Sequence, residues 1–168
     1  KHLSLIVMDN ELKKDFYEVV SDEQNRKKAQ ILVSLLNELE PYRMDLFMEK
    51  IGKDYAPFTK IYRYRPYHQL FEGYEEGGIV YKLDVHFYEN ESCLDFWCPN
   101  IEENKCTQFI SDRLSRIQLL EEFTLGGFGG GMYKWFTIED YHNIREIDEA
   151  VYTFVHNFFV KLRETHNS

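Results

Sequence analysis

The sequence has few of the features that mark a secreted or membrane-spanning protein. Its three cysteines are an odd number, at no spacing typical of a disulfide framework. The longest apolar run, Leu5 to Met8, is far too short to cross a bilayer, and a signal peptide needs a longer apolar stretch followed by small residues. We therefore expect a reduced, cytoplasmic protein with no membrane partner. The chain opens on Lys1, so one interpretation is a segment of a longer protein.

Motifs with a known chemistry are also missing. No Gly-x-Ser-x-Gly elbow appears, and the cysteines lack the Cys-x-x-Cys spacing of a structural zinc site. His68, His142 and His156 have no partner at the spacing by which a helix presents two ligands. We therefore assign no resident metal and no cofactor.

Basic residues are in the minority. The chain has 20 Lys and Arg against 29 Asp and Glu, a net charge of −9, which repels nucleic-acid backbones and attracts basic proteins. The segment KIYRYRPYH, residues 60–68, is basic and aromatic. It fits either a contact with single-stranded nucleic acid or an edge strand protected by charge. Given the net charge, we favour the edge strand and expect no nucleic-acid partner.

The sequence does contain two kinds of periodicity. The first third has the helical period, with apolar residues on one side of 10–20 and of the helix that follows, and a shorter helix at 42–52. From residue 59 the period changes to two, which predicts strands at 59–65, 79–88, 93–98 and 132–138, with helices at 102–120 and 147–164. We predict a single α+β domain over 1–168, helical at 1–53 and sheet-containing at 59–168. Its antiparallel sheet of about four to five strands packs against helices.

Two consecutive strands carry the sharpest candidate for chemistry. With a loop at Glu89–Ser92, His86 pairs with Asp95, and alternation places four polar residues on one face: Lys82, Asp84, His86 and Asp95. The other face is apolar: Leu83, Val85, Phe87, Leu94 and Phe96. Two carboxylates beside an imidazole can hold a divalent metal or orient a general base. The alternative is a solvated sheet face whose charges pair across strands.

Residues 124–136, TLGGFGGGMYKWF, contain five of the nine glycines. The run does not fit a phosphate-binding loop, because Met132 and Tyr133 stand in place of Lys and Ser or Thr, and it does not fit a dinucleotide loop. We interpret it as a mobile turn before a strand, where glycine permits a sharp turn or a close approach to a partner. The candidate binding surface consists of nearby rings and loop residues: Tyr133, Trp135, Trp97, Tyr74, Gly129 and Gly130.

These features leave three hypotheses open. The first is a non-enzymatic protein-binding protein, such as an acidic inhibitor, an immunity-type protein or an accessory protein, with a basic partner. The second is a small metal-dependent hydrolase or nuclease that uses Lys82, Asp84, His86 and Asp95. The third is a sensory or accessory domain of a longer protein. No pattern in the sequence points to an oligomeric state.

Overall fold

The computed structural model describes residues 10–166, so the apolar run Leu5–Met8 lies outside the described residues. The chain divides into two compact units, one up to Leu39 and the other from Glu40, and each is described by itself. The single-domain organisation stays a prediction. Among the described residues, no helix is both long and apolar enough to cross a membrane.

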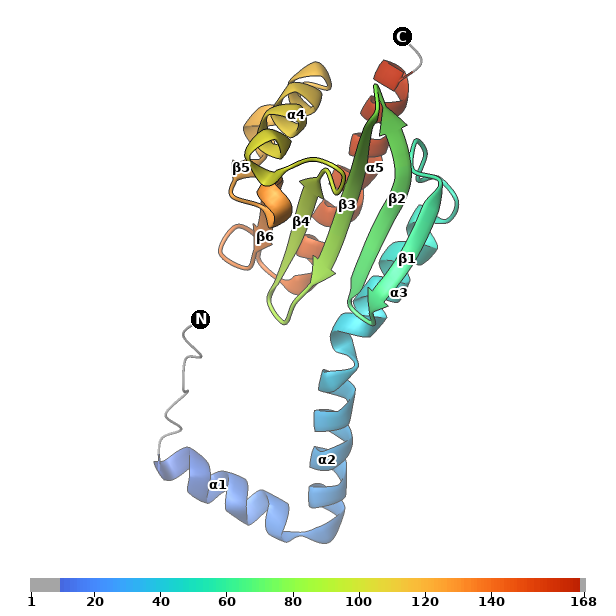
Figure 1. Ribbon diagram of the computed structural model, residues 1–168. Helices are drawn as coiled ribbons and strands as arrows, with labels where there is room; N and C mark the ends of the chain where they lie inside the picture. The colour runs from blue at the N-terminus through green and yellow to red at the C-terminus, as the bar shows by residue number, and fades with distance from the viewer. Residues whose placement is uncertain (1–9, 167–168) are drawn as a thin grey trace. The chain divides into compact units, whose positions relative to one another are not determined.

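Two helices form the first unit: α1 (Asn10–Ser21) and α2 (Glu23–Asn37) (Figure 1). Asp22 precedes α2, and its carboxylate accepts the backbone N–H of Asn25 at 2.9 Å, which satisfies one of the free donors at a helix start. Neither helix contains a buried residue. Most apolar side chains of the two helices are exposed, among them Leu12, Phe16, Val19, Ile31, Leu32, Leu35 and Leu36.

The second unit combines an antiparallel sheet with helices. Its strands are β1 (Lys60–Arg65), β2 (His68–Glu76), β3 (Ile79–Phe87), β4 (Glu91–Trp97), β5 (Thr124–Leu125) and β6 (Met132–Thr137). The strand order is β1-β2-β3-β4-β6-β5. Its α-helices are α3 (Leu39–Ile51), α4 (Glu103–Arg116) and α5 (Ile144–His166). The predicted α+β fold, with an antiparallel sheet and a helical N-terminal third, is confirmed. The strands that the sequence analysis did not include are β2 and the two-residue β5.

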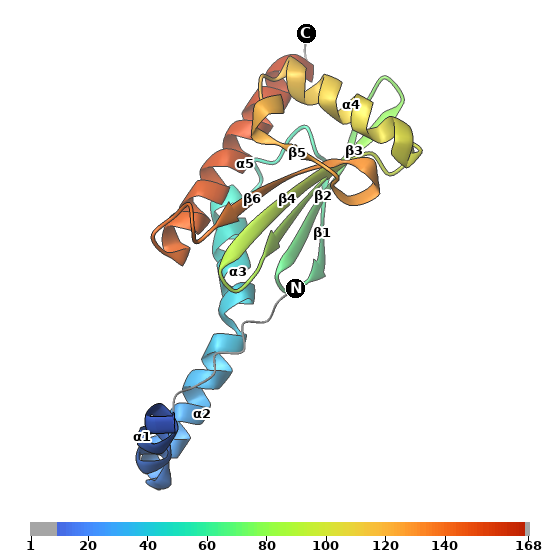
Figure 2. The ribbon, with the colours of Figure 1, turned by 90° about the vertical axis from the view of Figure 1, so that its left-hand side faces the viewer.

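The hydrophobic core lies between one face of the sheet and the helices of this unit, and α4 contributes Cys106, Ile110 and Leu114 to it. We call this side of the sheet the covered face, and α3 and α5 run along it, whereas α4 lies at one end of the sheet (Figure 2). Phe47 of α3 contacts Phe87 of β3, with ring centroids 5.7 Å apart. Phe158 of α5 contacts Phe96 of β4 at 5.1 Å. The opposite side, which we call the open face, carries the even-numbered residues of β3 and the odd-numbered residues of β4.

The β3–β4 hairpin differs in register from the prediction. Tyr88 donates its backbone N–H to the Glu91 carbonyl at 2.9 Å, so the turn is tighter than the predicted loop. As a result, Asp95 pairs with Asp84 and not with His86. The predicted pairing was wrong by two residues. Because this shift is even, each side chain keeps the face that alternation predicted for it.

Tyr74 is not the surface ring that the sequence analysis expected. The β2–β3 pairing shifts register between Phe71 and Tyr74, at a bulge that includes Gly73 with a φ of +76°. The extra residue turns Tyr74 to the covered face, where it is 1% exposed and its ring stacks on Tyr81 at 4.9 Å. The placement of Tyr74 in a binding surface was therefore wrong.

Candidate metal centre on the open face

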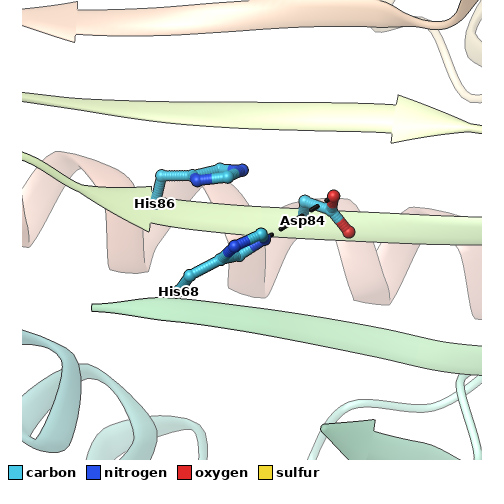
Figure 3. A group of neighbouring side chains, drawn as sticks. All are labelled: His68, Asp84 and His86. Carbon is cyan, nitrogen blue, oxygen red and sulfur yellow. Dashed lines mark ion pairs between the residues drawn. The ribbon is translucent and has the colours of Figure 1, made fainter. Parts of the chain in front are cut away.

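Two histidines face each other across neighbouring strands. His68 is the first residue of β2 and pairs directly with His86 of β3. The pairing with β3 extends to the residue before His68, where the Tyr67 carbonyl accepts the backbone N–H of Phe87 at 3.0 Å. The two imidazole rings stack with their centroids 3.7 Å apart (Figure 3).

Asp84 joins the two histidines. It lies two residues before His86 on β3, so its side chain projects from the same face (Figure 3). Its Oδ2 is 3.6 Å from Nε2 of His68. His68, Asp84 and His86 each offer one ligand atom, and these atoms lie within 4.8 Å of one another. We call these residues the ligand cluster, because two imidazoles and one carboxylate are protein ligands of catalytic zinc and non-haem iron(II) sites.

The ligand cluster contains buried polar atoms that make no hydrogen bond. Nε2 of His68 and Oδ1 of Asp84 are buried, and neither has a hydrogen-bond partner among the described residues. The Asp84 side chain is 8% exposed. A buried polar group that stays unsatisfied costs about 1–3 kcal/mol. Imidazole nitrogen and carboxylate oxygen are atoms of the kind that bind a metal ion.

His86 is neutral at physiological pH. Its pKa is lowered to about 4, mainly by burial and also by the neighbouring His68, while Asp84 acts in the opposite direction. A metal ion binds the neutral form of imidazole. Near pH 7, protons therefore compete only weakly for this ligand.

The other predicted catalytic residues border the cluster. Oδ2 of Asp95 is 3.9 Å from Nε2 of His86, and its Oδ1 accepts the backbone N–H of Phe128 at 3.2 Å. Burial raises the pKa of Asp95, and the Phe128 N–H partly opposes this change. Lys82 forms an ion pair with Glu72. The structure thus brings the four predicted catalytic residues to one surface: Lys82, Asp84, His86 and Asp95. Their catalytic roles stay predictions.

A pocket of about 490 Å³ surrounds the cluster. Its lining combines polar and apolar side chains: Tyr64, His68, Leu70, Lys82, Asp84, His86, Asp95, Trp97 and Phe128. Small-molecule sites in proteins have volumes of about 300–1,000 Å³. The pocket therefore has room for a small substrate beside an ion.

The glycine run lies close against the sheet. A Cβ at Gly131 would be 2.3 Å from the carbonyl oxygen of Phe96, so a side chain does not fit here. The sequence analysis allowed for a close approach of the glycine run to a partner. In the structure the run instead lies close to β4 of the same chain. The run presents Phe128, whose ring centroid lies 4.8 Å from that of Trp97. The loop thereby supplies one wall of the pocket.

The remaining predicted binding residues lie around this wall. Trp97 lines the pocket, and Tyr133 and Trp135 of β6 pair with open-face residues of β4. Gly129 and Gly130 take φ values of +58° and +76°, which glycine adopts readily, and so shape the loop. A binding role for these residues stays a prediction.

His68 is the site residue that the sequence analysis missed. That analysis considered histidine partners at helical spacing, whereas His68 and His86 meet across two strands. The available signal was the pair Pro66–Tyr67 between two aromatic-rich stretches, because a short turn between strand-like segments predicts a hairpin. A hairpin at this turn would have placed His68 at the start of a strand.

Comparisons with protein-family models, with curated proteins and with solved structures gave no match. A functional conclusion therefore depends on the geometry of the open face.

Proposed function

We propose that the chain is a small metal-dependent hydrolase that binds its ion at the ligand cluster. The observation that carries the proposal is the convergence of His68, Asp84 and His86 in a pocket of about 490 Å³, with unsatisfied polar atoms on two of them. The strand pairing adds support, because Asp84 lies directly opposite Asp95. Like charges at opposite positions destabilise a sheet, and a cation beside them removes that penalty.

The donor set favours a transition metal ion such as Zn²⁺. Imidazole nitrogen suits Zn²⁺ and Fe²⁺, whereas Mg²⁺ prefers oxygen ligands and keeps most of its waters. Three protein ligands leave a position for water, as in catalytic zinc sites. An ion held by His68, Asp84 and His86 would lower the pKa of a bound water and so make that water a better nucleophile for hydrolysis.

In this proposal Asp95 acts as the general base. It lies beside the ligand cluster without belonging to it, with its Oδ2 3.9 Å from Nε2 of His86. A carboxylate with a raised pKa is better matched to proton transfer near neutral pH. Lys82, held by Glu72, lines the pocket, where its ammonium group can donate a hydrogen bond to the oxyanion that develops during hydrolysis.

Nucleic acid suits this site less well than a small molecule. The net charge of −9 repels a phosphodiester backbone. The basic segment forms the edge strand β1, and its Arg63 already donates to Asp45, Gln69 and the Pro66 carbonyl. We therefore propose a hydrolase of small molecules and not a nuclease.

Metal-dependent stabilisation tests the binding step. We expect Zn²⁺ to raise the Tm of the wild-type chain by several degrees, because an ion at about 100 times its Kd adds about 2.7 kcal/mol. His68→Ala and Asp84→Asn should abolish this shift. His142→Ala is the matched control, since it removes a histidine that is 91% exposed and outside the pocket. An equal Zn²⁺ shift in all variants would overturn the proposal.

Hydrolysis is measured separately with 4-nitrophenyl acetate. We expect EDTA to remove the activity and Zn²⁺ to restore it. Asp95→Asn should lower kcat by about 100-fold or more, the usual contribution of a general base, while the Zn²⁺ shift in Tm persists. Full activity in Asp95→Asn would exclude Asp95 as the base.

Protein binding is the second candidate function. It is favoured by the exposed apolar residues of α1 and α2, which include Leu32 and Leu36 at 62% and 64% exposure. Such residues supply desolvated contacts at interfaces, and a net charge of −9 favours a basic partner. A basic protein should copurify with the wild-type chain and be lost in a Leu32→Ser, Leu36→Ser double variant. Equal recovery with both chains would contradict this role.

A further inference from the structure

Aromatic rings stand on both sides of the ligand cluster. Across the sheet, the pocket runs from Tyr64 of β1, through the ligands on β2 and β3, to Trp97 of β4 and the loop residue Phe128. The Tyr64 ring centroid is 5.3 Å from that of His68. At the other side, Trp97 and Phe128 meet edge to face. A substrate whose reacting group lies at the cluster therefore has an aromatic surface on either side.

The position of Phe128 is fixed by its own backbone. Its N–H donates to Asp95, the proposed base. Gly129, the next residue, takes a φ of +58°, and the Gly131 N–H donates back to the Phe128 carbonyl at 2.9 Å. The ring nevertheless remains 63% exposed. A large apolar ring that is held in place but exposed at the rim of a polar pocket is suited to contact with a ligand.

The charges of the pocket indicate a neutral substrate. Lys82 is paired with Glu72, so these two charges compensate each other. The carboxylates of Asp84 and Asp95 together carry the charge that a divalent ion neutralises. With the ion bound, the pocket has no excess charge that would select an anionic or a cationic substrate.

We infer that the substrate is a neutral ester or amide that carries an aromatic ring. This inference rests on the proposed hydrolase function. The ring stacks against Phe128 and Trp97, and the carbonyl lies at the ligand cluster. Water oxygen bonds to the acyl carbon while the C–O or C–N bond breaks. Asp95 takes one proton of the water and returns it to the leaving group, so the products are a carboxylic acid and an alcohol or amine.

Two matched esters test the inference. Methyl phenylacetate and methyl cyclohexylacetate have the same reacting group, and the saturated ring lacks the π-system. An aromatic pair contributes about 0.5–1.5 kcal/mol beyond its buried area, so we expect kcat/KM to be about two- to tenfold higher for the phenyl ester. Release of acid is followed by titration at constant pH with the Zn²⁺-loaded full chain.

Variants connect this preference to the pocket. Phe128→Leu should remove the preference for the phenyl ester and leave the Zn²⁺ shift in Tm unchanged. Leu125→Ala, an exposed residue near the loop but outside the pocket, should keep the preference. Equal kcat/KM for both esters, or a preference that survives in Phe128→Leu, would overturn the inference and leave the hydrolase intact. The absence of any Zn²⁺ shift would instead overturn the proposed function.

Discussion

On strands β3 and β4, the covered face and the open face differ in what they bury. The covered face holds apolar side chains that are at most 1% exposed: Leu83, Val85, Phe87, Leu94 and Phe96. The open face holds Asp84, His86 and Asp95, which are also largely buried but polar. Because successive residues of a strand point to opposite sides, one stretch of backbone supplies both sets. The sheet thus separates the residues that stabilise the fold from those of the candidate site.

The two faces contribute to stability with opposite sign. Full burial of a Leu or Phe side chain stabilises by about 1.5–3 kcal/mol. An unsatisfied buried polar atom, such as Oδ1 of Asp84, costs about 1–3 kcal/mol. Substitutions at neighbouring positions of one strand should therefore have very different effects.

The largest effect is expected on the covered face of β4. Phe96→Ala should destabilise the fold by about 3–5 kcal/mol, because it leaves a cavity against Phe158 of α5. Asp95→Asn, its neighbour on the open face, should change the free energy of unfolding by less than about 1 kcal/mol, since the amide oxygen can still accept the Phe128 N–H. Urea unfolding of both variants measures the difference. Similar losses would show that the two faces do not differ as described.

A smaller change in stability is expected when the pH is lowered, and its cause is His86 on the open face. The pKa of His86 is about 4 in the folded state and about 6.5 in an unfolded chain. Between these values the unfolded state binds more protons, so stability is highest above pH 6.5 and falls as the pH decreases toward 4. The loss is at most roughly 3 kcal/mol, and the raised pKa of Asp95 reduces it, because that proton is taken up first by the folded state.

Thermal or urea unfolding between pH 7 and pH 4 measures this dependence. His86→Gln should flatten the curve, whereas His142→Gln should leave it unchanged. An unchanged slope in His86→Gln would show that other groups cause the acid sensitivity.

The smallest effect is expected at Trp135 of β6. Its side chain is 40% exposed on the open face, whereas Phe136, the next residue, is 2% exposed on the covered face. Trp135→Ala should therefore cost about 1 kcal/mol or less, well below the value of about 3–5 kcal/mol for Phe136→Ala. Urea unfolding of the two variants measures this difference as a difference between their midpoints. Equal midpoints would show that Trp135 belongs to the core.

Alternation along single strands was predictable, and pairing between strands was not. A period of two assigned Leu83 and His86 to opposite faces correctly, although the predicted register was wrong by two residues. The contact of His68 with His86 depends on a hairpin turn, and the burial of Tyr74 depends on a bulge at Gly73. Pro66–Tyr67 was a local signal for a turn, but the pairing of residues across two strands is set by backbone geometry that the period of a single strand does not contain.

Helical periodicity has a similar limit. The apolar residues of α2, such as Leu35, follow the same period as those of α5, such as Val155. Val155 is fully buried in the core, and Leu35 is 61% exposed. The period therefore identifies which side of a helix is apolar, and the tertiary structure decides whether anything covers that side.

The order of the strands has a consequence for folding. β1 to β4 follow one another along the chain and are neighbours in the sheet, so the ligand cluster arises from a single hairpin, formed by β2 and β3. Local contacts of this kind form quickly, in about 1–10 μs for a hairpin. The Phe128 wall comes from a segment beyond α4 and requires a longer chain closure. We therefore expect the metal ligands to meet early during folding, before the glycine loop closes over them.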